Sequence, residues 1–106
     1  MKKIMTYGAF EVISGADIDL FKEGKALGND LMVVLLDDSL GKFKRPTHQR
    51  KEILEAIRYV DEVYIQVKEE DLKMYIETTN VDLILVSKQW KHVFQELDIT
   101  CDIIYR

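Results

Sequence analysis

The segment from Thr6 to Ile18 has the types and order of residues that a ligand site would need. A short apolar stretch leads into Gly8, a loop with Gly15 follows, and then a helical pattern begins, which is the layout of a nucleotide-binding strand, loop and helix. Such a loop binds phosphate because the free N–H groups and the dipole of a helix N-terminus attract anions. The segment holds no histidine, lysine or arginine, so the side chains that would act on a nucleotide are missing from it.

Ser14 and Asp17 stand three residues apart at the expected start of this helix. A serine at that distance from an acidic residue is typical of a capping box, although the pattern prefers Glu or Gln at its last position. We therefore interpret Ser14 to Asp17 as a helix start that its own side chains close. The alternative is a rebuilt active site. A phosphate placed about 4 Å from the Asp17 carboxylate would meet a repulsion of roughly 4 kcal/mol at a moderate dielectric.

A basic cluster occupies the second long loop and the helix start after it. Its members are Lys42, Lys44, Arg45, His48, Arg50 and Lys51. The cluster is consistent with a solvated loop or with a residual anion site. Asp37 and Asp38 precede it at the end of an expected strand, where an acidic pair can hold Mg²⁺. The further Asp and Lys of such sites cannot be placed here, so we interpret the pair as a solvated strand end.

The remaining candidate residues indicate structure more than chemistry. His48 is interpreted as a surface residue, and His92 has no metal-ligand partner one helical turn away, so no metal site is expected. Cys101 is the one cysteine, which excludes an internal disulfide, fits a reducing compartment and predicts a buried structural thiol. Trp90 is a candidate either for stacking on a nucleobase or for packing.

Strand and helix patterns alternate along the whole chain, and these elements must position the candidates. The expected strands are Lys3–Tyr7, Leu31–Leu36, Glu62–Val67, Asp82–Val86 and Thr100–Tyr105. The expected helices are Asp17–Leu27, a helix with Thr47 as its N-cap and an apolar stripe reaching Val60, Glu69–Thr79, and Lys88–Leu97. Gly28 with Asn29, and later Asn80, are expected to stop the first and third helices.

This alternation predicts the fold class: α/β, a single Rossmann-like domain over residues 1–106, with a five-stranded parallel sheet and helices on both faces. Ligands of such sheets bind outside the carboxyl ends of the strands, at the switch point of the strand order. The candidate site therefore comprises Tyr7–Asp17, Asp37–His48 and Ser87–Trp90.

Charge and hydropathy exclude some classes of function. The net charge is −4 and the pI about 5.1, which argues against general binding of nucleic acid or anionic membranes. No stretch approaches the roughly 18 apolar residues of a membrane span. The N-terminal apolar run is too short for a signal peptide. We expect a soluble, cytoplasmic protein.

Several stretches together resemble the bacterial glycerol-3-phosphate cytidylyltransferases. Thr6–Glu11 resembles the Thr-Tyr-Gly-Thr-Phe-Asp opening of that family, and Asn80–Leu83 and Trp90 fall in register with it. Arg50–Val63 is closer still, because it ends in the family's Arg-Tyr-Val-Asp-Glu-Val. Those residues are Arg58, Tyr59, Val60, Asp61, Glu62 and Val63. The resemblance covers nearly the whole chain, and the stretch Arg58–Val63 is its specific part.

The resemblance implies a transferase that joins CTP to a phosphorylated alcohol such as glycerol 3-phosphate and releases pyrophosphate. The family's His-x-Gly-His signature falls on Ser14–Asp17, so both histidines are replaced. Its Thr and Asp of the first loop are Ala9 and Glu11, and its Gly-Asp-Asp-Trp reads Ser87–Trp90, with Lys88 and Gln89 inside. Its Arg-x-x-Gly-Ile-Ser-Thr-Thr segment, which holds the triphosphate, would begin where this sequence ends, at Arg106.

The resemblance also implies a set of residual nucleotide contacts and a subunit contact. The nucleotide contacts would be Tyr7, Gly8, Ala9, Phe10, Lys44 and Trp90. Lys44 is matched to a family lysine that meets the phosphates. In the family, the stretch that corresponds to Arg58–Val63 lies near the homodimer contact.

We therefore expect a catalytically inactive cytidylyltransferase-like protein, a pseudoenzyme without metal or cofactor. It would act as a binding or assembly module, as a homodimer or with an active paralogue, and a CTP- or CMP-type nucleotide would be its remaining ligand. Two alternatives stay open. One is an active, Mg²⁺-dependent nucleotidyltransferase in which Lys44, Arg45, Lys88 and Arg106 replace the lost donors. The other is a generic α/β binding domain with neither nucleotide affinity nor self-association.

Overall fold

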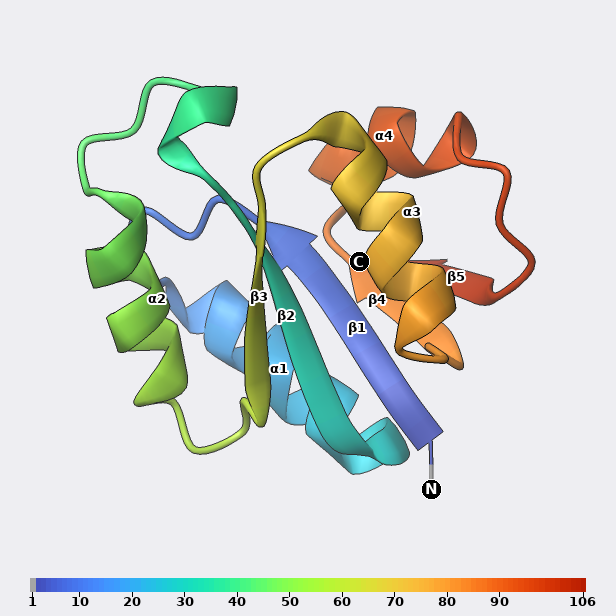
Figure 1. Ribbon diagram of the computed structural model, residues 1–106. Helices are drawn as coiled ribbons and strands as arrows, with labels where there is room; N and C mark the ends of the chain where they lie inside the picture. The colour runs from blue at the N-terminus through green and yellow to red at the C-terminus, as the bar shows by residue number, and fades with distance from the viewer. Residues whose placement is uncertain (1) are drawn as a thin grey trace.

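Five parallel strands form the sheet in the computed structural model, which describes residues 2–106. The strands are β1 (Lys2–Gly8), β2 (Asn29–Leu36), β3 (Glu62–Gln66), β4 (Leu83–Val86) and β5 (Asp102–Tyr105). Their order across the sheet is β3-β2-β1-β4-β5, and every neighbouring pair is parallel (Figure 1). The predicted parallel sheet is thereby confirmed. Met1, the first residue of the expected domain, lies outside the described residues.

The two strands at the centre of the sheet carry most of the core. β2 is buried from Leu31 to Leu36, as a continuous apolar run on a strand covered on both faces should be. β1 pairs with β2 at seven positions, from Lys2 to Gly8, but with β4 only at Ile4 and Met5. The strand order reverses at β1, so a crevice is expected outside the carboxyl ends of β1 and β4.

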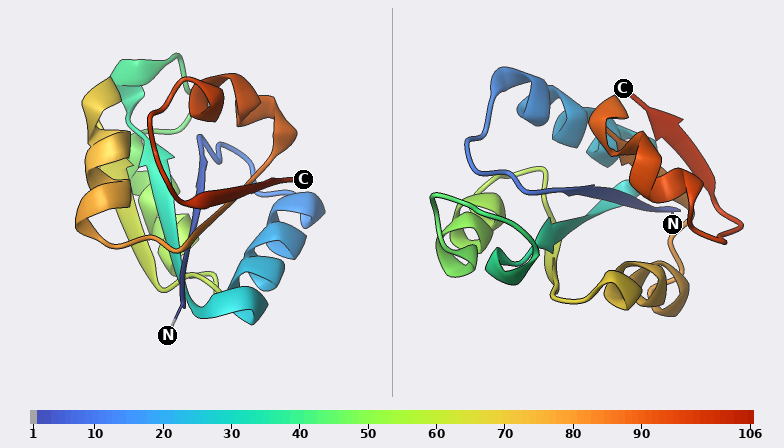
Figure 2. Two further views of the ribbon diagram at one scale, coloured as in Figure 1. Left: turned by 90° about the vertical axis from the view of Figure 1, so that its right-hand side faces the viewer. Right: turned by 90° about the horizontal axis from the view of Figure 1, so that it is seen from above.

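The helices cover both faces of the sheet, as predicted. They are α1 (Gly15–Gly28), α2 (Thr47–Glu55), α3 (Glu69–Thr78) and α4 (Lys91–Gln95). Leu20 and Phe21 of α1 and Leu54 of α2 pack on one face, whereas Leu72 of α3 and Phe94 of α4 pack on the other (Figure 2). Within residues 2–106, no helix has the length and apolar character that crossing a membrane would require.

The ends of the first and third helices confirm the predicted stops. Asn29 caps α1 with a φ of 67°, and Asn80 after α3 has a φ of 58°, both in the left-handed region that Asn tolerates. Gly28 is required for another reason. A Cβ there would lie 2.6 Å from the Lys2 carbonyl oxygen and 2.5 Å from the Ile4 side chain, so only glycine lets the end of α1 meet the start of β1.

The second helix differs from its prediction at both ends. Pro46, not Thr47, occupies the N-cap, and Thr47 is the first helical residue. The Thr47 hydroxyl is drawn away from the helix, since it donates to Asp37 Oδ1 and accepts the Asp38 N–H, each at 3.0 Å. α2 also ends at Glu55 rather than continuing to Val60, because the chain must turn in time for the Asp61 N–H to bond the Leu31 carbonyl at 2.9 Å.

The last expected helix, Lys88–Leu97, is shorter and broken. A 3₁₀ turn, η2 (Lys88–Trp90), precedes α4, and the Ser87 side chain caps it by accepting the Gln89 N–H. A similar turn, η1 (Asp38–Leu40), lies inside the loop expected over Asp37–Pro46. Both turns stand at the carboxyl end of the sheet and therefore shape the loops of the candidate site.

Candidate functional site

A cleft of about 480 Å³ opens outside the carboxyl ends of β1 and β4, at the predicted switch point. We call it the first cleft. The end of β1 and the loop after it, the first turns of α1, and the loop after β4 form its walls. The lining residues are Tyr7, Gly8, Ala9, Phe10, Glu11, Val12, Asp17, Leu20, Ser87, Gln89 and Trp90. Five of the six predicted nucleotide contacts thus lie together, and Lys44 is not among the lining residues.

The start of α1 is closed by Ser14 and Asp17. Asp17 Oδ2 accepts the Ser14 N–H at 2.9 Å and the Ser14 hydroxyl at 3.1 Å, while Ser14 Oγ accepts the Asp17 N–H at 3.3 Å. This reciprocal pattern is a capping box and confirms the interpretation made from the sequence. The helix N-terminus that would bind a phosphate therefore presents a carboxylate, and Asp17 also lines the first cleft.

Aromatic side chains form one side of the first cleft. The rings of Tyr7 and Trp90 meet edge to face, with 5.1 Å between their centroids. Phe10 has a φ of 46°, in the left-handed region, and its ring lies over Gly8. A Cβ on Gly8 would stand 3.1 Å from that ring and 3.4 Å from Trp90 Nε1. Gly8 therefore leaves space that the two aromatic side chains use.

The Tyr7 hydroxyl is committed to a structural contact. It donates to Gln66 Oε1 at 2.8 Å, and both residues are buried. Burial, with a smaller contribution from the charge of Glu69, raises the pKa of Tyr7 to about 12. Tyr7 therefore stays protonated at neutral pH and serves the cleft as a neutral ring, without the properties of a general base.

Arg50 is fully buried beneath the loops of the site. Its guanidinium donates to the carbonyls of Ala9 at 2.9 Å, Leu36 at 2.8 Å and Arg45 at 3.0 Å. It also pairs with Asp38 Oδ1 at 2.9 Å. One side chain thus joins the loop after β1, the end of β2 and the loop before α2.

The solvated-loop interpretation of the basic cluster therefore does not hold for Arg50. The sequence held one signal for its burial, since Arg50 lies four residues before the core residue Leu54 on the same face of α2. The basic residues around Arg50 in the sequence made its position look like part of a solvated stretch. Burial of the charge is compensated because the guanidinium bonds three carbonyls and a carboxylate, and it also stacks 4.4 Å from the Phe43 ring.

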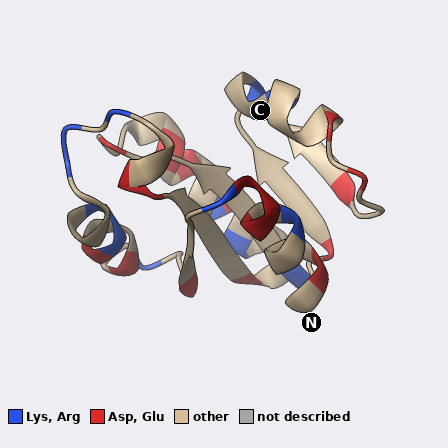
Figure 3. Cartoon of the chain, turned by 45° about the horizontal axis from the view of Figure 1, so that its top comes forward, with Lys and Arg blue, Asp and Glu red and all other residues tan. Residues whose placement is uncertain are grey.

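The basic side chains of the second loop do not line the first cleft. Lys42, Lys44 and Arg45 are exposed, and basic residues colour much of this loop in Figure 3. The backbone N–H of Lys44, rather than its ammonium group, makes the contact with the site, because it donates to a carboxylate oxygen of Glu11. His48 is exposed on the first turn of α2, as predicted.

Asp38 is exposed and Asp37 is half-buried at the end of β2, and both carboxylates also bind groups of the protein. The Ser39 hydroxyl and N–H hold the pKa of Asp37 below its usual value. The Thr47 N–H, followed by Arg50, does the same for Asp38. Through these contacts with Thr47 and Arg50, both carboxylates link the end of β2 to the start of α2. Among residues 2–106, no group of three or more His, Cys, Asp or Glu side chains is arranged to hold a metal ion.

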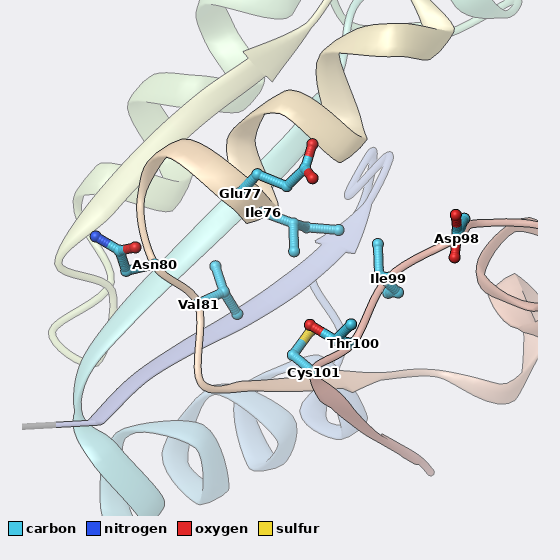
Figure 4. A pocket seen from close by; sticks show the side chains of 8 residues that line it. All are labelled: Ile76, Glu77, Asn80, Val81, Asp98, Ile99, Thr100 and Cys101. Atoms are coloured by element: carbon cyan, nitrogen blue, oxygen red, sulfur yellow. The ribbon is translucent and has the colours of Figure 1, made fainter.

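Two further hollows are present besides the first cleft. One, of about 500 Å³, shares Tyr7 as a wall and is lined by Glu69, His92 and Glu96 among others. The other, of about 290 Å³, lies between the end of α3 and the segment before β5 (Figure 4). Cys101 lines the latter and is half-buried rather than buried, and burial raises the pKa of its thiol.

The predicted dimer segment, Arg58–Val63, runs from the end of α2 into the edge strand β3. Arg58 is exposed and stacks 4.8 Å from the Tyr59 ring. Asp61 and Glu62 are held within the chain, by Lys25 at 2.6 Å and Lys3 at 3.2 Å respectively. Tyr59, Val60 and Val63 are half-buried against the core, so within the described part of the chain Arg58 is the residue of this segment that is exposed without an ion pair to another element.

Comparison with known proteins agrees with the resemblance seen in the sequence. The glycerol-3-phosphate cytidylyltransferase of Bacillus subtilis is 37% identical over 99% of this chain and 85% of its own length. That of Staphylococcus aureus is 32% identical over 99% of this chain and 83% of its own length. The FAD synthase of Thermococcus kodakarensis is 35% identical, but over only 59% of this chain. No protein-family model matches the chain.

A solved structure supports the fold alone. The lipopolysaccharide core biosynthesis protein of Thermoplasma volcanium superposes with a TM-score of 0.80 and 22% identity, covering 99% of this chain and 95% of that one. The two cytidylyltransferases match nearly the full chain at over 30% identity, and the matched region contains the segments that build the cleft. The chain therefore belongs to the glycerol-3-phosphate cytidylyltransferase family.

Proposed function

We propose that this chain is a cytidylyltransferase-like protein that does not catalyse nucleotidyl transfer and acts as a dimerising binding or assembly module. The observation that carries the proposal is the charge of the first cleft. Glu11 and Asp17 line it, and among residues 2–106 no lysine, arginine or histidine does. Nucleotide binding is at most residual under this proposal.

The charge of the cleft opposes the chemistry that the relatives' names describe. Transfer of a nucleotidyl group builds negative charge on phosphate, and enzymes stabilise that charge with positively charged or N–H donors. A carboxylate about 4 Å from a phosphate oxygen instead adds roughly 4 kcal/mol of repulsion at an effective dielectric of 20. Loss of a single donor typically costs about a hundred- to a thousand-fold in rate.

Basic residues that could replace the lost donors lie elsewhere. Arg106 pairs with Glu23 on α1, and Lys44 is not a lining residue of the cleft. Lys88 is exposed on η2 and is not a lining residue either. These placements support the inactive module over the alternative, an active enzyme that transfers CMP from CTP to a phosphorylated alcohol with an altered site.

The catalytic part of the proposal is tested by calorimetric titration of CTP, with and without Mg²⁺, together with a pyrophosphate-release assay containing glycerol 3-phosphate. We expect no pyrophosphate release and weak or undetectable heat. Pyrophosphate release that disappears in Lys44→Ala would establish the active alternative instead. Absence of both CTP-binding heat and self-association would favour the other alternative, a generic α/β binding domain.

The assembly part of the proposal rests on Arg58–Val63, which runs into β3, and on the position of β3 at the edge of the sheet. We propose a homodimer, or a complex with an active paralogue, through this surface. Sedimentation equilibrium should show a dimer at micromolar concentration that Arg58→Glu weakens. Arg45→Glu is the matched control, because Arg45 is also exposed but lies in the loop before α2. A monomer throughout would remove this part of the proposal.

A further inference from the structure

The walls of the first cleft combine aromatic rings with carboxylates. Tyr7, Phe10 and Trp90 supply the rings, and Glu11 and Asp17 supply the charges. The Tyr7 hydroxyl is turned to Gln66, and Phe10 packs against Phe21 with 5.3 Å between centroids, so the aromatic walls are fixed by the core behind them. His92 stacks on Trp90 but is not a lining residue of the cleft.

The charge balance at the cleft is negative. The N-terminus of α1 contributes about half a positive charge, whereas Glu11 and Asp17 contribute two carboxylates. Each carboxylate is held through one oxygen. One oxygen of Asp17 accepts the Ser14 N–H, and one oxygen of Glu11 accepts the Lys44 N–H. Within residues 2–106, the second oxygen of each receives no hydrogen bond from the protein and remains available to a ligand.

We infer that the first cleft binds a small organic cation of the alkylammonium class. Aromatic rings attract such ions through the negative potential of their faces, most strongly for tryptophan, and carboxylates add direct attraction. A bare metal ion fits less well, because rings are not ligands and the described residues hold no cluster of metal-binding side chains. The inference rests on the proposed function in one respect, namely that the cleft binds a ligand and does not transfer a nucleotidyl group.

Trp90 makes the inference directly testable, because it is the only tryptophan of the chain and lines the cleft. The protein is titrated with tetramethylammonium chloride and, separately, with tert-butanol, a neutral molecule of similar size. Sodium chloride keeps the ionic strength constant. We expect a saturable change of tryptophan fluorescence with the cation, and an affinity for tert-butanol lower by about tenfold or more.

Two variants tie the signal to the cleft. Glu11→Gln and Asp17→Asn remove one charge each, and both amides retain an oxygen that can accept the Lys44 and Ser14 N–H groups. We expect each to weaken tetramethylammonium binding by about three- to tenfold. Glu70→Gln, on the exposed first turn of α3, is the matched control and should bind as the parent does. Circular dichroism verifies that each variant folds.

Three outcomes would overturn the inference: equal affinity for the cation and tert-butanol, a fluorescence change no larger than that caused by sodium chloride, or unaltered binding in both Glu11→Gln and Asp17→Asn. Tighter binding of CMP than of tetramethylammonium would also overturn it. These failures are distinguishable from failure of the proposed function. Absence of cation binding leaves the pyrophosphate result untouched, whereas pyrophosphate release contradicts the proposed function whatever the cation does.

Discussion

At the scale of single residues, the site depends on an arginine that never reaches the solvent. The Arg50 guanidinium satisfies the carbonyls of Ala9, Leu36 and Arg45, which belong to three different segments. Buried carbonyls left without a donor are costly, so the position of the loop after β1 depends on this side chain. Arg50 is therefore a positioning residue for the first cleft, and it touches none of the space a ligand would use.

Replacing Arg50 by methionine should destabilise the protein by about 3 kcal/mol or more, because three carbonyls lose their donor at a cost of roughly 1–3 kcal/mol each before relaxation. Lys51→Met is the control. Its exposed ion pair with Glu55, one helical turn away, is worth about 0.5 kcal/mol or less. Urea denaturation measures both free energies of unfolding. Similar values for the two variants would show that the loops are held by other contacts.

At the scale of elements, α1 occupies the place of a phosphate-binding helix, but its N-terminus is closed by a capping box. Ser14 and Asp17 satisfy the first free N–H groups, and the acidic side chain complements the helix dipole. The same helix buries Leu20 and Phe21 against β1 and β2, so its cap and its core face support one another. The stability gained at this helix start is thus coupled to the loss of an anion site.

Ser14→Ala should reduce the free energy of unfolding by about 1 kcal/mol, the usual cost of losing a serine N-cap. Ser14→Asn should stay within a few tenths of a kcal/mol of the parent, because asparagine caps about as well. Thermal or urea unfolding of the two variants measures the difference. An alanine variant as stable as the asparagine variant would mean that Asp17 alone closes the helix.

The order and type of the elements could be predicted from the sequence, because burial imposes a period on each. The run Leu31–Leu36 and the stops at Asn29 and Asn80 are examples. The ends of α2 were not predictable in this way. Thr47 has the type of an N-cap, but its hydroxyl is used by Asp37 and Asp38 at the other end of the loop that leads into α2. Likewise, the burial of Arg50 depends on carbonyls that only the folded sheet brings together.

At the scale of the whole molecule, charged side chains fasten the end of the sheet opposite the first cleft. The Asp61 carboxylate accepts the Leu31 N–H at 2.8 Å and pairs with Lys25 at 2.6 Å, so it joins α1, β2 and the start of β3. Partial burial opposes ionisation of Asp61. The Leu31 N–H and Lys25 outweigh it and hold the pKa of Asp61 below the usual 3.8.

The sign of this shift predicts how stability depends on pH. A carboxylate whose pKa is lowered by folding contributes its full stability above the usual pKa of 3.8, and the contribution is lost as the pH falls through the lowered value. Asp61→Asn should therefore be less stable than the parent at neutral pH, with the difference shrinking below pH 3.8. Urea midpoints across this range test it. Parallel curves for the two proteins would contradict the role of Asp61.

The uneven pairing of β1 sets an order in which the domain can assemble. β2, with which β1 pairs at seven positions, follows β1 in the chain after one helix. β4, with which β1 pairs at two positions, begins only after three-quarters of the chain. Contacts between segments close in sequence form early because closing a short loop costs little entropy. The segments up to β3 can thus fold as a nucleus during synthesis, and β4 and β5 dock later on the open flank of β1. The first cleft needs Asp17 from the early half and Trp90 from the late half, so it is completed only in the later stage of assembly.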